Sequence, residues 1–537
     1  MGESGIHALE LVFLSLLVLV VVFAALARKL QTPYPIVLVI AGLALSFVPG
    51  IPKVTLNPDV VFLLVLPPLL YYSAWQMPWR EFKFNLVSIC FLAFGLVGFT
   101  VAGVAWSARW VFAGFDWRLG FALGAVVATT DAIAATSIAK RVGLPRQIVD
   151  VLEGESLLND ASGLLALEFA VAMVVTGETP TVGQGILRLA YLVVAGILFG
   201  LLIGVVSEAI HKQMDDGPIE ITLSILVPYT VYLGAEALHC SGVLAVIACG
   251  LYMSRHSSHF FSANVRIQGW AVWDSLTFML NGLVFVLIGL QLPFVLAGIR
   301  EYSFRELLRD GLVFSALLIL LRLIWVFPGG YLANFVRRRL LHQKLGWPKP
   351  RQIFVVGWTG MRGVLALAAA LALPETLADG SPFPQRNLII FLTFCVILVT
   401  LVLQGLLLPP LIRGLGLAGA STSHKEEEEQ ARRAMIEAGL ALLAEAREGS
   451  SPQLVRVYDD IERRYRRRLA HLTGLNDRGE AIDPEEQTQY LQLLRNLVNA
   501  ERKTAVGMRD AGCINDDVLR KLEHELDLTE TRLSLVS

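Results

Sequence analysis

Residues 153–163 read Glu-Gly-Glu-Ser-Leu-Leu-Asn-Asp-Ala-Ser-Gly, and they lie inside an apolar run that extends from residue 148 to 175. Residues 128–132, Ala-Thr-Thr-Asp-Ala, interrupt the preceding apolar run, 118–139. An ionisable side chain at the middle of a bilayer costs roughly 2.5–3.5 kcal/mol on insertion scales, so such a side chain needs a partner or a function. These two stretches therefore indicate both the fold and the place of a functional site.

The composition is that of a polytopic membrane protein. Of the 537 residues, 55% are hydrophobic and 17% are charged, and the mean hydropathy is +0.60, whereas soluble domains carry about 25% charged residues. These values exclude a disordered chain, a disulfide scaffold and most soluble enzymes. The net charge of −1 gives no reason to expect a nucleic-acid partner. The five cysteines are too few and too scattered for a disulfide framework or a metal cluster.

Charge density divides the chain near residue 413. Residues 1–413 carry 27 basic and 23 acidic side chains, and the much shorter stretch 414–537 carries 18 and 23. We therefore predict a transmembrane domain over 1–413 and a water-soluble, mostly helical domain over 414–537. A regulatory role and a role in assembly or stability both remain open for this tail, whose partner is unknown.

The first part contains apolar runs that are separated by short polar loops. A span needs roughly 17–25 mostly apolar residues. We count thirteen runs: 7–27, 35–48, 60–75, 86–113, 118–139, 148–175, 186–210, 219–238, 242–254, 270–292, 311–335, 353–374 and 388–411. An N-terminus outside places most loop lysines and arginines inside, including Arg337–Arg339, as the positive-inside rule requires. We therefore expect about thirteen transmembrane helices in a plasma membrane (a bacterial inner membrane) with a cytoplasmic tail.

The polar residues of run 148–175 lie on one face of the predicted helix. Glu155, Ser156, Asn159 and Asp160 are three or four positions apart, so their side chains form one stripe. Helix packing explains isolated serine or asparagine residues, but it does not explain carboxylates in two adjacent runs. Hard cations prefer oxygen ligands, and the absence of Cys and His from these stretches disfavours a transition metal.

Two later runs supply positive charge. Arg322 lies deep in run 311–335, and Arg362 lies in 357–363, Gly-Trp-Thr-Gly-Met-Arg-Gly. Three glycines in seven residues weaken a helix, and irregular backbone inside a membrane must be buried in protein or line a cavity. The interrupted runs are the fifth and the twelfth, and an odd offset of seven gives them opposite orientations. This layout predicts an inverted repeat with a binding site near the bilayer midplane.

The predicted site suits cation/proton exchange. A buried carboxylate holds a proton or a small cation but not both well, and a proton-coupled symporter would use similar groups. Glu155 and Arg322 could form a neutral pair, which leaves Asp160 facing Asp131 across the site. One exchanging carboxylate suggests one proton for each monovalent cation.

Three motifs carry a family resemblance. Residues 154–160 (Gly-Glu-Ser-Leu-Leu-Asn-Asp), Thr130-Asp131 and residues 360–363 (Gly-Met-Arg-Gly) resemble the electroneutral branch of the monovalent cation/proton antiporters. That branch includes the NhaP-type bacterial Na+/H+ exchangers and the animal sodium/proton exchangers, whereas the electrogenic branch has Asp where Asn159 stands. The resemblance covers about residues 7–412.

The resemblance implies an all-α, NhaA-like antiporter fold with inverted repeats and crossed unwound helices. It also implies a homodimer in lipid that moves a core domain against a dimerisation domain, like an elevator. The expected activity is 1:1 exchange of Na+ for H+ in pH and sodium homeostasis, with Li+ or K+ as alternative cations and no cofactor. Residues 67–70 (Pro-Pro-Leu-Leu) are followed by Tyr71-Tyr72, where the family often has an acidic residue, so the choice among cations stays open.

The resemblance also assigns roles, position by position. Asp160 is the carboxylate that binds the ion or the proton, and Asn159 is its motif neighbour. Asp131, Ser156 and the backbone of Thr130 are further ligands, so that Na+ would lie at Asp131, Ser156 and Asp160. Glu155 with Arg322 forms the structural ion pair, and Arg362 supports the helix crossing.

Three other functions compete with exchange. A symporter for an organic substrate would need a roomier cavity with aromatic or amide groups. An intramembrane enzyme is disfavoured, because the sequence has neither an HExxH motif nor aspartate-rich motifs on adjacent runs. A channel would carry cation current, whereas a one-for-one exchanger would carry none.

Overall fold

The structure is a computed structural model, and it describes residues 3–48, 56–112, 114–177, 181–214, 216–299, 302–343, 346–377, 379–419, 422–447, 452–473, 484–511, 513 and 516–534. Contacts divide the chain into two units, Met1–Ala420 and Ser421–Ser537. Each unit is described below by itself. The assignment of the two units to membrane and cytoplasm stays a prediction.

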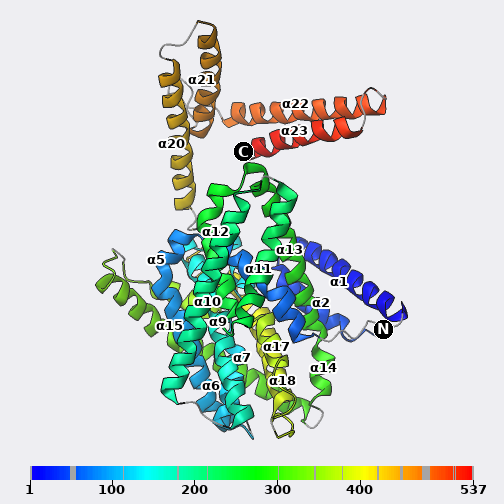
Figure 1. Cartoon of the computed structure of the whole chain (residues 1–537), viewed down its shortest axis with the longest axis vertical. Coiled ribbons are helices and arrows are strands. Elements are labelled where there is room, and N and C mark those ends of the chain that lie inside the picture. The colour runs from blue at the N-terminus through cyan, green and yellow to red at the C-terminus, as the bar shows by residue number, and fades with distance from the viewer. Residues whose placement is uncertain are drawn as a thin grey trace. The chain divides into compact units, whose positions relative to one another are not determined.

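The first unit is built from helices (Figure 1). Its first half comprises α1 (Glu3–Lys29), α2 (Tyr34–Leu45), α3 (Pro58–Val60), η1 (Val61–Val65), α4 (Leu66–Gln76), α5 (Trp79–Cys90), η2 (Phe91–Leu96), α6 (Val97–Val111), α7 (Trp117–Ala128), α8 (Ala132–Val142) and α9 (Arg146–Thr176). Its second half comprises α10 (Val182–His211), α11 (Gly217–Ala237), α12 (Gly242–Phe260), α13 (Ala263–Leu290), α14 (Leu292–Ala297), α15 (Phe304–Arg339), α16 (Pro350–Trp358), α17 (Val364–Leu371), α18 (Arg386–Leu398), η3 (Val399–Gln404) and α19 (Gly405–Gly414). The η segments are π-helical turns inside longer helices.

The predicted polytopic, all-α fold is confirmed. Every predicted apolar run coincides with one helix or with two or three consecutive helical segments. Within the described ranges, ten helical segments are long and apolar enough to cross a membrane, and α2 is a shorter apolar helix. The count of thirteen spans stays a prediction.

Helix α9 packs against helices from both halves of the first unit. It contacts α7, α8, α5 and η2 on the N-terminal side of the chain and α16 and α17 on the C-terminal side. Its 31 residues form one uninterrupted helix, although the middle of that helix carries Glu155, Asn159 and Asp160. The polar stripe can be accommodated because the helices that face it are broken and offer free backbone groups.

Both predicted interruptions are present. The helix of run 118–139 ends at Ala128 and resumes at Ala132, with Thr129 in an extended conformation (φ −66°, ψ 139°). The helix of run 353–374 ends at Trp358 and resumes at Val364. Four half-helices, α7, α8, α16 and α17, therefore end or begin inside the unit.

The second unit contains two helical hairpins. α20 (Thr422–Arg447) packs against α21 (Pro452–Thr473), and α22 (Pro484–Asp510) packs against α23 (Asp516–Ser534). Ion pairs join the helices within each hairpin: Arg447 lies 3.0 Å from Asp459, and Arg502 lies 2.7 Å from Asp527. Most of the side chains described here are exposed, as the high charge density of the tail predicts.

Candidate cation-binding site at the helix crossing

The two interrupted helices are joined to each other at their breaks. The backbone N–H of Asp131, in the first break, donates a hydrogen bond to the Met361 carbonyl in the second, at 2.8 Å. In the opposite sense, Arg362 Nε in the second break donates to the Val127 carbonyl at the end of α7, at 3.2 Å. Each break thus satisfies backbone groups that the other leaves without a helical partner, and the unwound segments meet there.

Asp131 lies at the start of two half-helices. Its Oδ1 caps α8 by accepting the N–H of Ile133 at 2.8 Å. A Cβ atom at Gly363, the residue before α17, would lie 2.5 Å from Asp131 Oδ2, so only glycine leaves room for the carboxylate there. The carboxylate therefore lies at the positive ends of both α8 and α17.

Arg362 lies at the ends of the other two half-helices. Besides Val127, its guanidinium reaches the Gly360 carbonyl just beyond α16, with Nη1 at 2.5 Å from the oxygen. Its backbone N–H donates to the hydroxyl of Thr400 in η3, at 3.0 Å. Only 2% of the residue is exposed, so the charge is held by backbone carbonyls and by the negative ends of α7 and α16.

Glu155 and Arg322 form a buried, two-pronged ion pair. Arg322 Nη1 lies 2.5 Å from Glu155 Oε1, and Nη2 lies 2.9 Å from Oε2. Arg322 also donates to the carbonyls of Gly357 and Val356, at 3.1 and 3.0 Å. Both residues of the pair are 1% exposed. A Cβ atom at Gly360 would collide with the Arg322 side chain, which explains a second glycine of the break.

Asn159 and Thr130 extend this network toward the first break. Asn159 Nδ2 donates to Thr130 Oγ1 at 2.5 Å, and the Thr130 hydroxyl donates to Glu155 Oε1 at 3.3 Å. The Thr130 hydroxyl is therefore engaged on both sides. Ser156 Oγ accepts the backbone N–H of Ala132 at 3.1 Å, which ties α9 to the start of α8.

The carboxylate of Asp160 differs from the neighbouring polar side chains in its accessibility and in its lack of a partner among the described residues. Asp160, Asp131 and Ser156 are partly accessible, whereas Glu155 and Asn159 are fully buried. Asp160 lies one turn after Ser156, whose hydroxyl binds the backbone N–H of Ala132, the residue after Asp131, so the two carboxylates are neighbours. Among the described residues, no hydrogen bond or ion pair engages the Asp160 carboxylate. The site therefore presents two neighbouring carboxylates, one of which has no partner of its own.

All the residues singled out in the sequence lie at the helix crossing or in the network that supports it. Glu153, which also belongs to the stretch 153–163, lies elsewhere, paired with Lys140 at 2.7 Å. Sequence reasoning missed Thr400, although a threonine inside an apolar run was a visible signal. It also missed the carbonyls of Val127 and Met361, which carry no signal because every residue has one.

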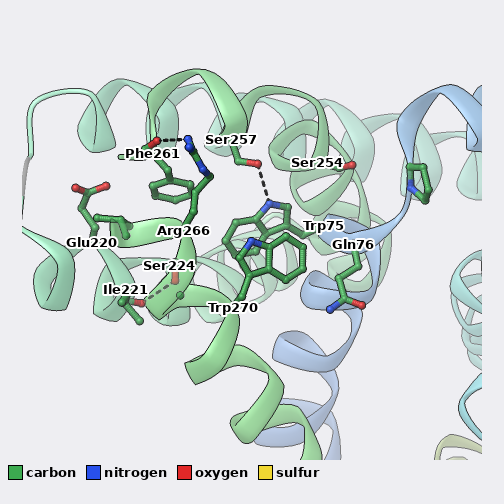
Figure 2. Close-up of a pocket in the computed structure, with 13 residues that line it drawn as sticks. Trp75, Gln76, Glu220, Ile221, Ser224, Ser254, Ser257, Phe261, Arg266 and Trp270 are labelled. Carbon is green, nitrogen blue, oxygen red and sulfur yellow. Dashed lines mark hydrogen bonds between the residues drawn. The ribbon is translucent and has the colours of Figure 1, made fainter. Parts of the chain in front are cut away.

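A separate cavity of about 320 Å³ lies among α4, α11, α12 and α13 (Figure 2). Trp75 donates to Ser257 at 3.0 Å there, and Arg266 donates to the Phe261 carbonyl at 2.6 Å. Its lining includes Glu220 but none of the residues of the helix crossing.

Comparison with known proteins identifies the family of this chain. Residues 15–414 match the family described as "Sodium/hydrogen exchanger, transmembrane". An uncharacterized Na+/H+ exchanger of Mycobacterium tuberculosis is 33% identical over 99% of this chain and 97% of its own length. A sodium, potassium, lithium and rubidium/H+ antiporter of Bacillus pumilus is 34% identical over 74% of this chain and 61% of its own length. The solved structure of the sodium proton antiporter MjNhaP1 from Methanocaldococcus jannaschii shares the fold, with a TM-score of 0.58 and 20% identity over 76% of this chain and 99% of that one. The chain belongs to the transmembrane sodium/hydrogen exchanger family.

Proposed function

We propose that this protein is a secondary antiporter that exchanges one Na+ for one H+ at Asp160. The observation that carries the proposal is the unequal pairing of charges at the helix crossing. Arg322 is bound to Glu155, and Arg362 is bound to the carbonyls of Val127 and Gly360. Asp160 has no cationic partner among the described residues, so a mobile cation or a proton is left to neutralise it.

The charges of the crossing indicate the stoichiometry. Glu155, Asp131 and Asp160 contribute three negative charges, and Arg322 and Arg362 contribute two positive ones. The net charge of the group is therefore −1 when all the carboxylates are ionised. One monovalent cation or one proton makes the group neutral, and a neutral site crosses a low-dielectric membrane at the least cost. This balance supports electroneutral 1:1 exchange.

Competition between the two ions follows from the carboxylate itself. A bound cation favours the ionised carboxylate and expels the proton, while protonation removes the charge that holds the cation. Oxygen ligands for a hard cation are at hand in Asp131 and in the Ser156 hydroxyl, which has accepted one hydrogen bond and retains a second lone pair. We propose that Na+ lies at Asp131, Ser156 and Asp160.

Alternating access is the remaining part of the proposal. As the family resemblance implies, the helices around the crossing would move like an elevator, in a homodimer. We also propose that the protein lies in a plasma membrane with its N-terminus outside and its tail in the cytoplasm, and that it serves pH and sodium homeostasis. The name of the Bacillus pumilus relative includes potassium, lithium and rubidium, so K+/H+ exchange is the alternative activity.

Proton flux in reconstituted vesicles tests the assignment of Asp160. The wild-type protein should dissipate a preset pH gradient when Na+ is added, and separate additions of K+ and Li+ identify the preferred cation. Asp160→Asn removes the titrating group with almost no change of volume and should abolish the flux. Glu153→Gln is the matched control, because it neutralises a carboxylate of the same helix that is paired with Lys140 outside the site; it should retain the flux. Flux of wild-type size in Asp160→Asn would refute the assignment.

A clamp of the membrane potential tests the stoichiometry separately. With K+ and valinomycin setting potentials of either sign, the initial rate of Na+-driven proton movement should stay the same, because one charge moves in each direction. A rate that changes steeply with potential would exclude 1:1 exchange while leaving the antiport itself intact.

A further inference from the structure

A second cavity of about 320 Å³ lies at the end of α15, and among the residues of the helix crossing and its network described above it is lined by Val356 alone. Its walls come from α5, η2, the start of α9, the C-terminal half of α15, residues 346–348 and α16. Most of the wall is apolar and includes Leu92, Val326 and Ile353, which pack together as a small core of their own. The cavity has the size and lining of a small-molecule site.

One charged side chain faces this apolar wall. Arg337 is 5% exposed, and its guanidinium donates to three neutral groups: Gln343 Oε1 at 2.8 Å, Ser88 Oγ at 3.1 Å and Asn85 Oδ1 at 3.2 Å. These bonds use three of its five N–H groups. None of the described residues that line the cavity is acidic, so the buried positive charge has no carboxylate there to neutralise it.

Asn334, one turn before Arg337 on α15, provides an independent observation. The residue is 7% exposed, lines the cavity, and its Nδ2 is buried without a hydrogen-bond partner. A buried donor without a partner costs about 1–3 kcal/mol, so an acceptor is expected at this position. Arg337 and Asn334 together favour a ligand that is anionic and offers several hydrogen-bond acceptors. The cavity of Figure 2 differs, because its lining contains an acid, Glu220, as well as a base, Arg266.

The position in the chain suggests where such a ligand comes from. Arg337 lies in the last turn of a long apolar helix, where a membrane-spanning segment ends. Trp347, which lines the cavity and is 60% exposed, has the guanidinium of Arg338 5.0 Å from its ring centroid. An exposed tryptophan beside arginines is typical of the level of lipid headgroups, and basic pockets between helices at that level bind anionic headgroups.

We propose that this cavity binds an anionic membrane phospholipid, with the phosphate accepting hydrogen bonds from Arg337 and Asn334 and the first part of an acyl chain lying on the wall around Val326 and Ile353. The exposed Lys349 and Arg351 beside the cavity add positive charge near its lining. The ligand would bridge α5, α9, α15 and α16 on the side of the protein where Arg337–Arg339 end a span. This inference does not depend on the exchange activity, because binding and transport are measured separately.

Thermal unfolding of the purified full-length protein in detergent, with lipid added back, tests the proposal. Phosphatidylglycerol should raise the melting temperature of the wild type, whereas phosphatidylethanolamine and inorganic phosphate should not. Arg337→Gln and Gly330→Leu should each weaken the apparent affinity for phosphatidylglycerol by about tenfold or more, the first by removing the charge and the second by filling the cavity. A Cβ at Gly330 would meet no atom closer than 3.6 Å, so the backbone at this position accepts a side chain. The rest of the leucine side chain would occupy the cavity. Gly330→Leu also covers the possibility that Arg337→Gln, which loses its bonds to α5, fails to fold.

Arg188→Gln is the control, because that arginine belongs to an exposed pair with Glu168 and neither residue lines the cavity; it should respond to lipid as the wild type does. Native mass spectrometry should find one anionic lipid fewer per protomer in Gly330→Leu than in the control. Equal responses of the wild type and both cavity variants would overturn the proposal. So would an equal effect of phosphatidylethanolamine, or the full effect with inorganic phosphate alone, which would make this a site for a free anion.

Discussion

Replacing Arg322 by methionine should destabilise the protein far more than any single exposed ion pair could. The change keeps a long unbranched side chain but removes both bonds to Glu155 and the bonds to the Gly357 and Val356 carbonyls. Glu155 would then be a carboxylate that is 1% exposed and whose remaining hydrogen-bond donor among the described residues is the Thr130 hydroxyl at 3.3 Å.

The size of the effect follows from the burial of the pair. Breaking a buried ion pair by removing one partner costs about 3–5 kcal/mol, because the other charge stays behind without compensation. With about 2–4 °C for each kcal/mol in larger domains, the melting temperature should fall on the order of 10 °C. Removing both charges, in Glu155→Gln with Arg322→Met, should recover at least about half of that loss, since no uncompensated charge remains.

Thermal denaturation in detergent measures both effects, with Arg188→Met as the matched control. Arg188 pairs with Glu168 at 3.3 Å, but both side chains are about half exposed, so this change should cost less than about 1 kcal/mol. The reasoning is wrong if Arg322→Met melts within the range of the control. It is also wrong if the double variant is no more stable than the single one.

Three further changes test the geometry of the crossing. Gly363→Ala places a Cβ 2.5 Å from Asp131 Oδ2 and should displace the carboxylate. The rate of Na+-driven proton flux should then fall at least about tenfold. Unchanged flux would contradict the close packing of Gly363 against Asp131. Thr400→Val removes the acceptor of the Arg362 N–H and should cost about 1–3 kcal/mol of stability in thermal denaturation, whereas Thr230→Val, on an exposed face of α11, should cost little. Asp131→Asn keeps a good cap for α8, so the melting temperature of this variant should stay near that of the wild type. The Na+ concentration for half-maximal flux should rise. A large loss of stability would instead make Asp131 mainly structural.

The fold was predictable because the bilayer constrains the sequence strongly. Apolar runs predict spans, and every predicted run coincides with one helix or with two or three consecutive helical segments. The interruptions at 129–131 and 359–363 were predictable as well, since polar and glycine residues there break runs that are otherwise apolar. The π-helical turns η1, η2 and η3 were not predictable, because Val, Leu and Phe fill them as they fill the adjoining α-helices.

The site was predictable only where it is formed by side chains and not by backbone groups. Glu155 and Arg322 could be matched from charge alone across 167 positions of sequence, and the structure places them in contact. The partners of Arg362 could not be named, because two of them are backbone carbonyls and the choice among carbonyls depends on the crossing angle of the broken helices. The same holds for the bond from Asp131 to Met361. The sequence therefore indicates which charges are present but not which of them are already compensated.

Compensation by the half-helices gives a physical reason for the proposal that Asp160, rather than Asp131, is the exchanging group. Each helix end carries about half an elementary charge, positive at the N-terminus and negative at the C-terminus. Asp131 lies against the N-terminal ends of α8 and α17, so about one unit of positive charge offsets its carboxylate. Arg362 lies against the C-terminal ends of α7 and α16, so about one unit of negative charge offsets its guanidinium. With Glu155 neutralised by Arg322, Asp160 is the one carboxylate of the described crossing that is offset by neither a helix end nor an arginine. A cation or a proton must supply the missing charge, and in the proposed exchange whichever ion does so is the one that the protein carries.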